Sequence, residues 1–205
     1  VWRMAASLLQ RGHVAETLRL AEETAAALSA SDTLLQANLA VVGSKALLML
    51  SRFPEAEARG REALLLADRL DDTLAALAAG IRARAGASLA IVMQITGRRE
   101  AAISQWHVVI AAASAAGLMR FRPRCLFNLA NVLYEQGDLT AAFESCSAAL
   151  RGLRQIGDSY AMSRVLHTLA IIHSTRTEWQ EALALLDEAC TIKRSIGDRT
   201  GLYNS

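Results

Sequence analysis

Proline, aromatic residues and lysine are scarce in this sequence of 205 residues. Pro54 and Pro123 are the two prolines, and aromatic side chains make up 5% of the chain although hydrophobic residues make up 53%. A core with this composition consists mainly of alanine and leucine, and alanine is the best helix former. Long alternations of β-branched residues, which are typical of strands, are also absent. The composition therefore excludes a sheet-rich fold and favours an all-α one.

The charge is low and is carried by arginine. Lys45 and Lys193 are the two lysines, a bias that we interpret as that of a GC-rich bacterial genome. The net charge of +2 is too small to indicate nucleic acid as a direct partner. No apolar run is expected to reach the roughly 18 residues of a membrane span. The opening Val1-Trp2-Arg3 leads into a predicted helix rather than a signal peptide. We therefore expect a cytoplasmic protein that does not bind membranes.

Cysteine is also rare. Cys125, Cys146 and Cys190 are an odd number and show no CxxC spacing. Cys146 and Cys190 fall on predicted apolar faces, so we expect buried free thiols in a reducing compartment rather than disulfides or a metal site.

The stretch from residue 126 to residue 158 is a pair of predicted amphipathic helices joined by a tight turn at Gly137-Asp138. Apolar residues follow helical spacing on one face of each helix, and Gly157-Asp158 ends the unit. Asp138 is placed to cap the second helix. Ala130, Ala142 and Ala149 are small enough to let the two helices approach closely. Such a pair cannot bury its apolar face alone and is expected to stack on copies of itself.

The copies are present along the whole chain. The turn between the two helices recurs at Gly12, Ser51, Gly97, Gly137 and Thr177, and the last three positions are 40 residues apart. A nearly fixed period of this length predicts a helical solenoid of about five helix-turn-helix repeats. The predicted single array covers residues 1–205, with repeats at about 1–32, 33–72, 73–117, 118–158 and 159–198 and the start of a further repeat at 199–205.

The best-formed repeat resembles the tetratricopeptide repeat (TPR) family. The residues that carry the resemblance are Asn128-Leu129-Ala130-Asn131, Tyr134 and Gly137-Asp138. The 40-residue length is similar to a long-repeat subclass found in bacterial ATPase-linked (maltose-activator-like) transcription regulators, kinesin light chains and spindle-orientation adaptors. The resemblance implies a right-handed α-solenoid in which the first helix of each repeat lines a concave groove.

The same resemblance implies which residues face that groove and bind a partner. They are Asn38, Lys45, Arg84, Gln94, Arg124, Phe127, Asn131, Tyr134, Arg164 and His167. Arg84, Arg124 and Arg164 occupy one slot of successive repeats and would form an arginine ladder, which continues at Asn204. A ladder of this kind fits a peptide with acidic groups, because arginine binds carboxylates in a bidentate fashion. The alternative is that these arginines are solvated or pair with acids of the preceding repeat, as Arg164 would with Asp158.

Catalytic and metal-binding motifs are missing from the sequence, so we expect neither an enzyme nor a cofactor.

Three structural details are also predicted. The helix at 73–95 bends or breaks early near Gly80, and Thr177 to Gln180 form a capping box. Trp106 and Trp179 pack in the core.

The sequence therefore predicts a non-enzymatic interaction or sensor module of a larger bacterial signal-transducing or transcription-regulating protein, which binds a peptide or protein in its groove. The alternative is a free-standing adaptor. Apolar residues of the first helix, together with Leu183 and Leu186 of the last pair, also predict end-to-end self-association.

Overall fold

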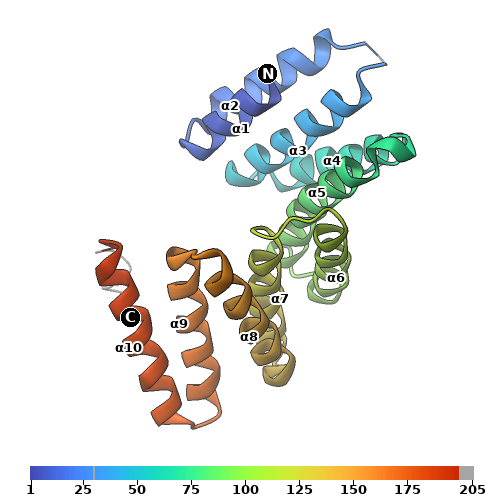
Figure 1. The fold of residues 1–205 in the computed structure, drawn as a ribbon. Coiled ribbons are helices and arrows are strands. Elements are labelled where there is room, and N and C mark those ends of the chain that lie inside the picture. Colours follow the sequence, from blue (N-terminus) through green and yellow to red (C-terminus); the bar gives the residue numbers. More distant parts are fainter. Residues whose placement is uncertain (30, 199–205) are drawn as a thin grey trace. The chain divides into compact units, whose positions relative to one another are not determined.

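The computed structural model describes residues 1–29 and 31–198, which form ten α-helices and one short 3-10 helix, with no strand in these ranges (Figure 1). The elements are α1 (Trp2–Gln10), α2 (Val14–Ala27), α3 (Thr33–Met49), α4 (Phe53–Ala67), η1 (Asp72–Leu74), α5 (Ala75–Ile95), α6 (Arg99–Ala115), α7 (Arg122–Gln136), α8 (Leu139–Ile156), α9 (Ser159–Thr175) and α10 (Trp179–Ser195). The prediction of an all-α chain built from five helix pairs is confirmed.

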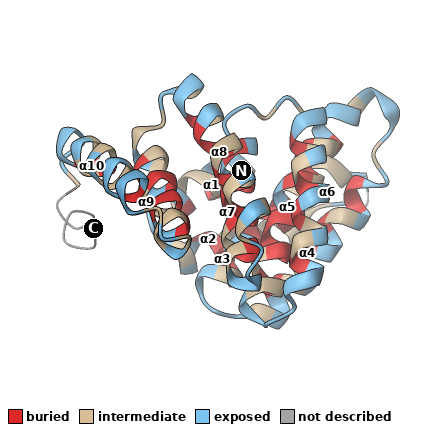
Figure 2. Ribbon diagram, turned by 90° about the horizontal axis from the view of Figure 1, so that it is seen from below, coloured by how far each residue is buried: buried red, intermediate tan, exposed pale blue. Residues whose placement is uncertain are grey.

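The chain forms two compact units, 1–117 and 118–205, which we call unit 1 and unit 2. Unit 1 contains the pairs α1–α2, α3–α4 and α5–α6, and unit 2 contains α7–α8 and α9–α10. Inside each unit the first helix of a pair packs against both helices of the preceding pair. The buried residues face these contacts, and the outer faces are exposed (Figure 2). A single continuous array over 1–205 remains a prediction.

Small residues set the distance between paired helices. Ala142 and Ala149 of α8 are completely buried. On the same helix, a Cβ atom at Gly152 would lie 2.6 Å from Cγ of Pro123 on α7. In unit 1, a Cβ atom at Gly86 of α5 would lie 2.7 Å from Cγ2 of Val109 on α6. These helices therefore touch through backbone on one side and a large side chain on the other, and no larger residue fits without displacement.

Helix α5 differs from expectation in two respects. It runs unbroken from Ala75 to Ile95, so the predicted early break near Gly80 is wrong. The segment Asp72–Ile95 is also long and apolar enough to cross a membrane, which corrects the expectation that no apolar run reaches that length. However, 67% of its most apolar window is buried inside the chain, because α5 packs against α3, α4 and α6 in the centre of unit 1. The segment therefore serves as the core helix of unit 1.

All five predicted turn positions adopt the left-handed backbone conformation. The φ angles are 85° at Gly12, 59° at Ser51, 78° at Gly97, 90° at Gly137 and 62° at Thr177. At Gly137, the following amide of Asp138 donates to the carbonyl of Leu133 at 3.0 Å, as in a Schellman cap. Ser51 and Thr177 hold this conformation without being glycine, which costs free energy.

The start of the last helix corrects another prediction. Helix α10 has Glu178 as its N-cap, with no side-chain hydrogen bond, and the hydroxyl of Thr177 donates instead to the carbonyl of Arg176. The predicted capping box is therefore wrong, because the left-handed Thr177 belongs to the preceding helix end. The Asp138 cap is confirmed, since its carboxylate accepts from the amide of Ala141 at 3.0 Å.

The two tryptophans in question have opposite environments. Trp106 is completely buried on α6, as predicted, and its indole nitrogen has no hydrogen-bond partner. Trp179 on α10 is 59% exposed, so its predicted core position is wrong. The structure leaves the Trp179 slot open because no described helix packs over that face of α10. In the first helix, α1, apolar residues were expected to be exposed. Met4 is exposed, whereas Leu9 is buried.

The non-glycine turns generate a stability prediction. Thr177→Gly removes the steric cost of a left-handed threonine, which outweighs the greater chain entropy of glycine when unfolded. We expect the free energy of unfolding to rise by about 0.5–1 kcal/mol in urea titration. The matched control is Gly137→Thr in the same slot, which should lower the free energy of unfolding by about 1 kcal/mol or more. Destabilisation by Thr177→Gly would contradict this account of the turn.

Candidate functional site

The candidate site is a polar hollow of about 340 Å³ on unit 2, which we call the unit 2 groove. It is lined by helices α7, α9 and α10, together with Asp198, which follows the end of α10. Its lining consists of Phe127, Asn131, Tyr160, Arg164, His167, Thr168, Lys193 and Asp198.

Helical periodicity brings these side chains to one side. On α9 the lining positions 160, 164, 167 and 168 follow the spacing of one helix face, and on α7 positions 127 and 131 are one turn apart. Buried residues such as Leu129 and Leu169 occupy the opposite faces and hold α7 and α9 in their pairs. The same packing that buries one face therefore presents the other to the groove.

An aromatic–arginine contact crosses the groove from α7 to α9. The guanidinium carbon of Arg164 lies 5.4 Å from the centroid of the Phe127 ring. Phe127 is 8% exposed, whereas Arg164 is exposed. The ring supports the guanidinium by a cation–π interaction, which leaves its N–H groups able to donate to a ligand.

The wall of the groove formed by α10 and Asp198 combines opposite charges. Lys193 of α10 is 6% exposed, which is unusual for a lysine, and Asp198 is half-buried beside it in the lining. His167, Lys193 and Asp198 each take part in an interaction within the chain, so none of them is a free group. With Arg164 included, the lining carries two permanent positive charges and one carboxylate.

Four of the predicted groove residues are brought together here, namely Phe127, Asn131, Arg164 and His167. Sequence reasoning missed Tyr160, Thr168, Lys193 and Asp198. Tyr160 and Thr168 lie one turn on either side of Arg164, so helical spacing from Arg164 was a usable signal. Lys193 lies on the second helix of its repeat, and the assumption that only first helices line the groove excluded it.

The predicted ladder residue Arg124 has a different role. It lies outside the lining of the groove, and its Nη2 donates to Oδ2 of Asp158 at 2.7 Å. Arg124 therefore pairs with an acid, as the alternative proposed, but with one of its own repeat rather than of the preceding repeat, and the expected pairing of Asp158 with Arg164 is wrong. Arg164 stacks on Phe127 instead.

Asp158 also caps α9 and accepts from the amide of Ala161 at 3.1 Å. Burial on its own would raise the pKa of Asp158, but the hydrogen bonds from Arg124 and from the Ala161 amide outweigh it and hold the pKa below its usual value. Asp158 is therefore ionised at neutral pH and fixes the start of α9, the helix that supplies half of the lining residues.

The remaining predicted site residues lie elsewhere. Tyr134 lies further along α7, outside the lining of the groove. Its hydroxyl is 3.4 Å from the hydroxyl of Thr175 on α9. In unit 1, Asn38 donates to the carbonyl of Leu34 at 2.8 Å and lines a hollow beside Trp2. Lys45 and Arg84 are exposed, and Gln94 is half-buried. Arg84 donates to the carbonyl of Gly80 at 3.2 Å, and although much of its side chain is exposed, the desolvation of its guanidinium group by neighbouring atoms lowers the pKa of Arg84.

A second, apolar hollow of about 350 Å³ adjoins the groove on the α9–α10 face and shares His167 with it. Ile171, Trp179 and Leu183 line this hollow, and all three are exposed. The exposure of Leu183 agrees with the expectation from the sequence.

The cysteines and acidic residues offer little metal or thiol chemistry. Within residues 1–29 and 31–198, no group of three or more histidine, cysteine, aspartate and glutamate side chains is placed to hold a metal ion. Cys125 and Cys146 are buried free thiols, and burial raises the pKa of each to about 12. Cys190 is only half-buried, which corrects the expectation that it is fully covered.

Comparison with known proteins agrees with this architecture. Residues 123–195 match the family model described as tetratricopeptide repeat. No curated protein matches the sequence. Among solved structures, the apo form of RapI is 14% identical, with a TM-score of 0.80 over 96% of this chain and 70% of that chain.

Two further structures match at the same identity. Aspartyl phosphate phosphatase F from Bacillus subtilis has a TM-score of 0.77 over 90% of this chain and 46% of that chain. The Rap conjugation gene regulator of the plasmid pLS20, in complex with the Phr* peptide, has a TM-score of 0.71 over 95% of this chain and 52% of that chain. This chain spans about half the length of these two proteins. Together with the family match over residues 123–195, the comparisons give this chain a helical-repeat fold of the tetratricopeptide type.

Proposed function

We propose that this chain is a non-enzymatic interaction module whose unit 2 groove binds an extended peptide or protein segment with acidic groups. The observation that carries the proposal is the convergence of Phe127, Asn131, Arg164 and His167, all predicted from the sequence to bind a partner, in one hollow. A volume of about 340 Å³ is enough for one or two side chains of a bound peptide.

The chemistry of the lining fits this ligand. The Asn131 side-chain amide has both donor and acceptor atoms, which match the alternating groups of a peptide backbone. Arg164, held on the Phe127 ring, presents paired N–H donors that match a carboxylate. Lys193 adds a second positive charge at the wall, which the carboxylate of Asp198 in the same lining offsets. An acidic side chain therefore has a charged, bidentate partner, and a neighbouring apolar side chain has the exposed ring of Tyr160.

A protein of similar fold supports a peptide as the ligand, because the pLS20 Rap regulator is described in complex with the Phr* peptide. By analogy, we infer a regulatory or sensor role within a larger bacterial, cytoplasmic signal-transducing or transcription-regulating protein. Membership of the long-repeat subclass is part of the same proposal. A free-standing adaptor is the second candidate, and the sequence of the whole parent protein separates the two.

An enzymatic role has less support, although one protein of similar fold is named a phosphatase. The described lining of the unit 2 groove contains no cysteine or serine that could act as a nucleophile. The buried thiols of Cys125 and Cys146 stay protonated at neutral pH, since the pKa of each is about 12. The groove is better equipped to bind than to react.

The exposed apolar residues Trp179 and Leu183 support a further proposal, that isolated chains associate end to end. Light scattering should show a mass that rises with protein concentration, and Leu183→Glu should suppress the rise. A mass of 22.0 kDa at every concentration would contradict association.

The binding proposal predicts a difference between arginines on the two sides of unit 2. A peptide selected from a random library on immobilised protein should be enriched in aspartate and glutamate. Arg164→Glu should weaken its binding by about tenfold or more in fluorescence anisotropy, because a carboxylate then faces a carboxylate. Higher salt should weaken wild-type binding too.

The matched control is Arg151→Glu, which changes an exposed arginine on the second helix α8 by the same charge. Its affinity for the selected peptide should stay within about twofold of wild type, in keeping with the small energies of exposed surface charges. Equal losses from both variants would mean that total charge, and not the groove, determines binding.

A further inference from the structure

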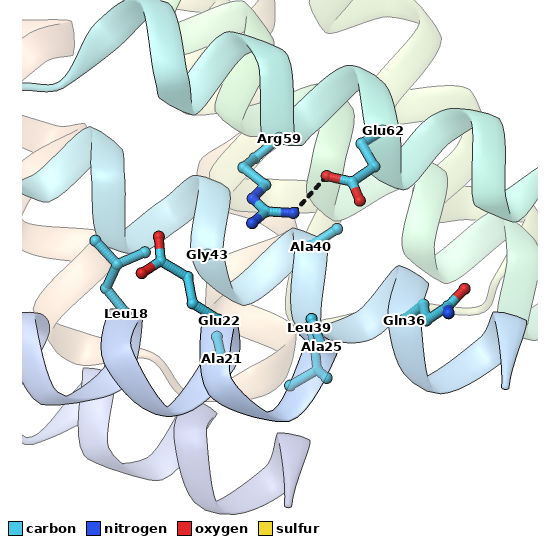
Figure 3. A pocket seen from close by; sticks show the side chains of 10 residues that line it. All are labelled: Leu18, Ala21, Glu22, Ala25, Gln36, Leu39, Ala40, Gly43, Arg59 and Glu62. Atoms are coloured by element: carbon cyan, nitrogen blue, oxygen red, sulfur yellow. Dashed lines mark hydrogen bonds and ion pairs between the residues drawn. The ribbon is translucent and has the colours of Figure 1, made fainter. Parts of the chain in front are cut away.

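A hollow of about 140 Å³ opens in unit 1 between α2, α3 and α4 (Figure 3). None of its lining residues belongs to the unit 2 groove or to the residues predicted from the sequence to bind a partner. Its lining consists of Leu18, Ala21, Glu22, Ala25, Gln36, Leu39, Ala40, Gly43, Arg59 and Glu62.

The internal repeats explain why the hollow exists. Gly43 lies eight residues before the turn at Ser51, and the same slot before the turns at 97, 137 and 177 holds Leu89, Leu129 and Leu169. All three leucines are buried, at 2–3% exposure. The second repeat therefore has glycine where the later repeats have a core leucine.

The preceding helix does not compensate for the missing side chain. In the third repeat Leu89 packs onto Gly60 of α4, where a Cβ atom would lie 2.8 Å from Cδ2 of Leu89. The residue of α2 in the slot of Gly60 is Ala21, nine residues after its own turn. Gly43 thus faces alanine, a small residue against a small residue, and a Cβ atom at Gly43 would meet nothing within 4 Å. The hollow therefore lies where the later repeats have the side chain of their core leucine.

Charged side chains surround its mouth. Glu22 of α2 and Arg59 of α4 extend on either side of Gly43, and Glu62 lies beside Arg59 (Figure 3). Nη1 of Arg59 donates to Oε2 of Glu62 at 2.7 Å, so these two charges compensate each other. Glu22 forms no ion pair or hydrogen bond with any described residue and interacts with Arg52 only electrostatically at longer range. The mouth therefore has one carboxylate, that of Glu22, that forms no direct ion pair with a described residue.

We propose that this hollow binds a small branched aliphatic ammonium ion. The alkyl body occupies the vacant leucine slot between Ala21, Leu39 and Gly43, and the ammonium group lies against Glu22. The size agrees, since an apolar cavity of about 150 Å³ accommodates a molecule as large as benzene. The charge agrees because an ammonium donates charge-assisted hydrogen bonds to a carboxylate. The site is independent of peptide binding in unit 2.

The probe for this proposal is 3-methylbutan-1-amine, whose alkyl chain matches that of leucine, with 3-methylbutan-1-ol as the neutral control. Wild-type protein should show a melting temperature that rises with amine concentration. The methyl NMR signals of Leu18 and Leu39 should shift in the same titration. The alcohol should bind more weakly, and Glu22→Gln should weaken amine binding by about fivefold.

Two variants at Gly43 make the test specific. Gly43→Leu restores the residue of the later repeats, so it should raise the melting temperature without ligand and abolish the response to the amine. Gly43→Ala fills the hollow in part and should weaken binding even if leucine overpacks the site. No methyl shift in wild type, or an unchanged response in both variants, would overturn the site. Equal binding of alcohol and amine would overturn the assignment of the ligand as a cation.

Discussion

The fold depends on the contact of a small residue on one helix with a large side chain on its neighbour. Val109 packs against Gly86, Pro123 packs against Gly152, and Leu89 packs against Gly60. These contacts bring helices close enough for an alanine- and leucine-rich core to fill space without large aromatic residues. Where the contact is incomplete, as between Gly43 and Ala21, the chain contains a hollow.

This constraint also leaves the groove available for function. Because the apolar face of each helix is used in packing, the polar residues on the opposite face of α7 and α9 carry no structural demand of that kind, although Phe127 on that face is itself largely buried. Phe127, Asn131 and Arg164 occupy that face. Their positions are nevertheless firm, since Asp158 fixes the start of α9 through its cap and its bond to Arg124. A binding surface built in this way can change its side chains without changing its fold.

The sequence predicted the helix pairs and the turns well, because both depend on local rules. The turns at Ser51 and Thr177 were placed correctly although neither residue is glycine, since the repeat pattern identifies the slot independently of the residue type; their left-handed conformation was not predicted. Features that depend on neighbours were predicted less well. Trp179 occupies a packing slot but stays exposed, because the slot is covered only where another helix follows. Periodicity alone also did not distinguish Arg124, which pairs with an acid, from Arg164, which stacks on a ring.

A double-mutant cycle at Gly152 and Pro123 tests the small-to-large contact most directly. Gly152→Ala alone should lower the free energy of unfolding by about 1–3 kcal/mol, because the rigid proline ring cannot move away from the added methyl group. In a Pro123→Ala background the same change should cost less than about 0.5 kcal/mol or stabilise, since alanine is the better helix former once the clash is gone. The account therefore predicts strong coupling between the two positions. Additive effects, with the same cost of Gly152→Ala in both backgrounds, would contradict it.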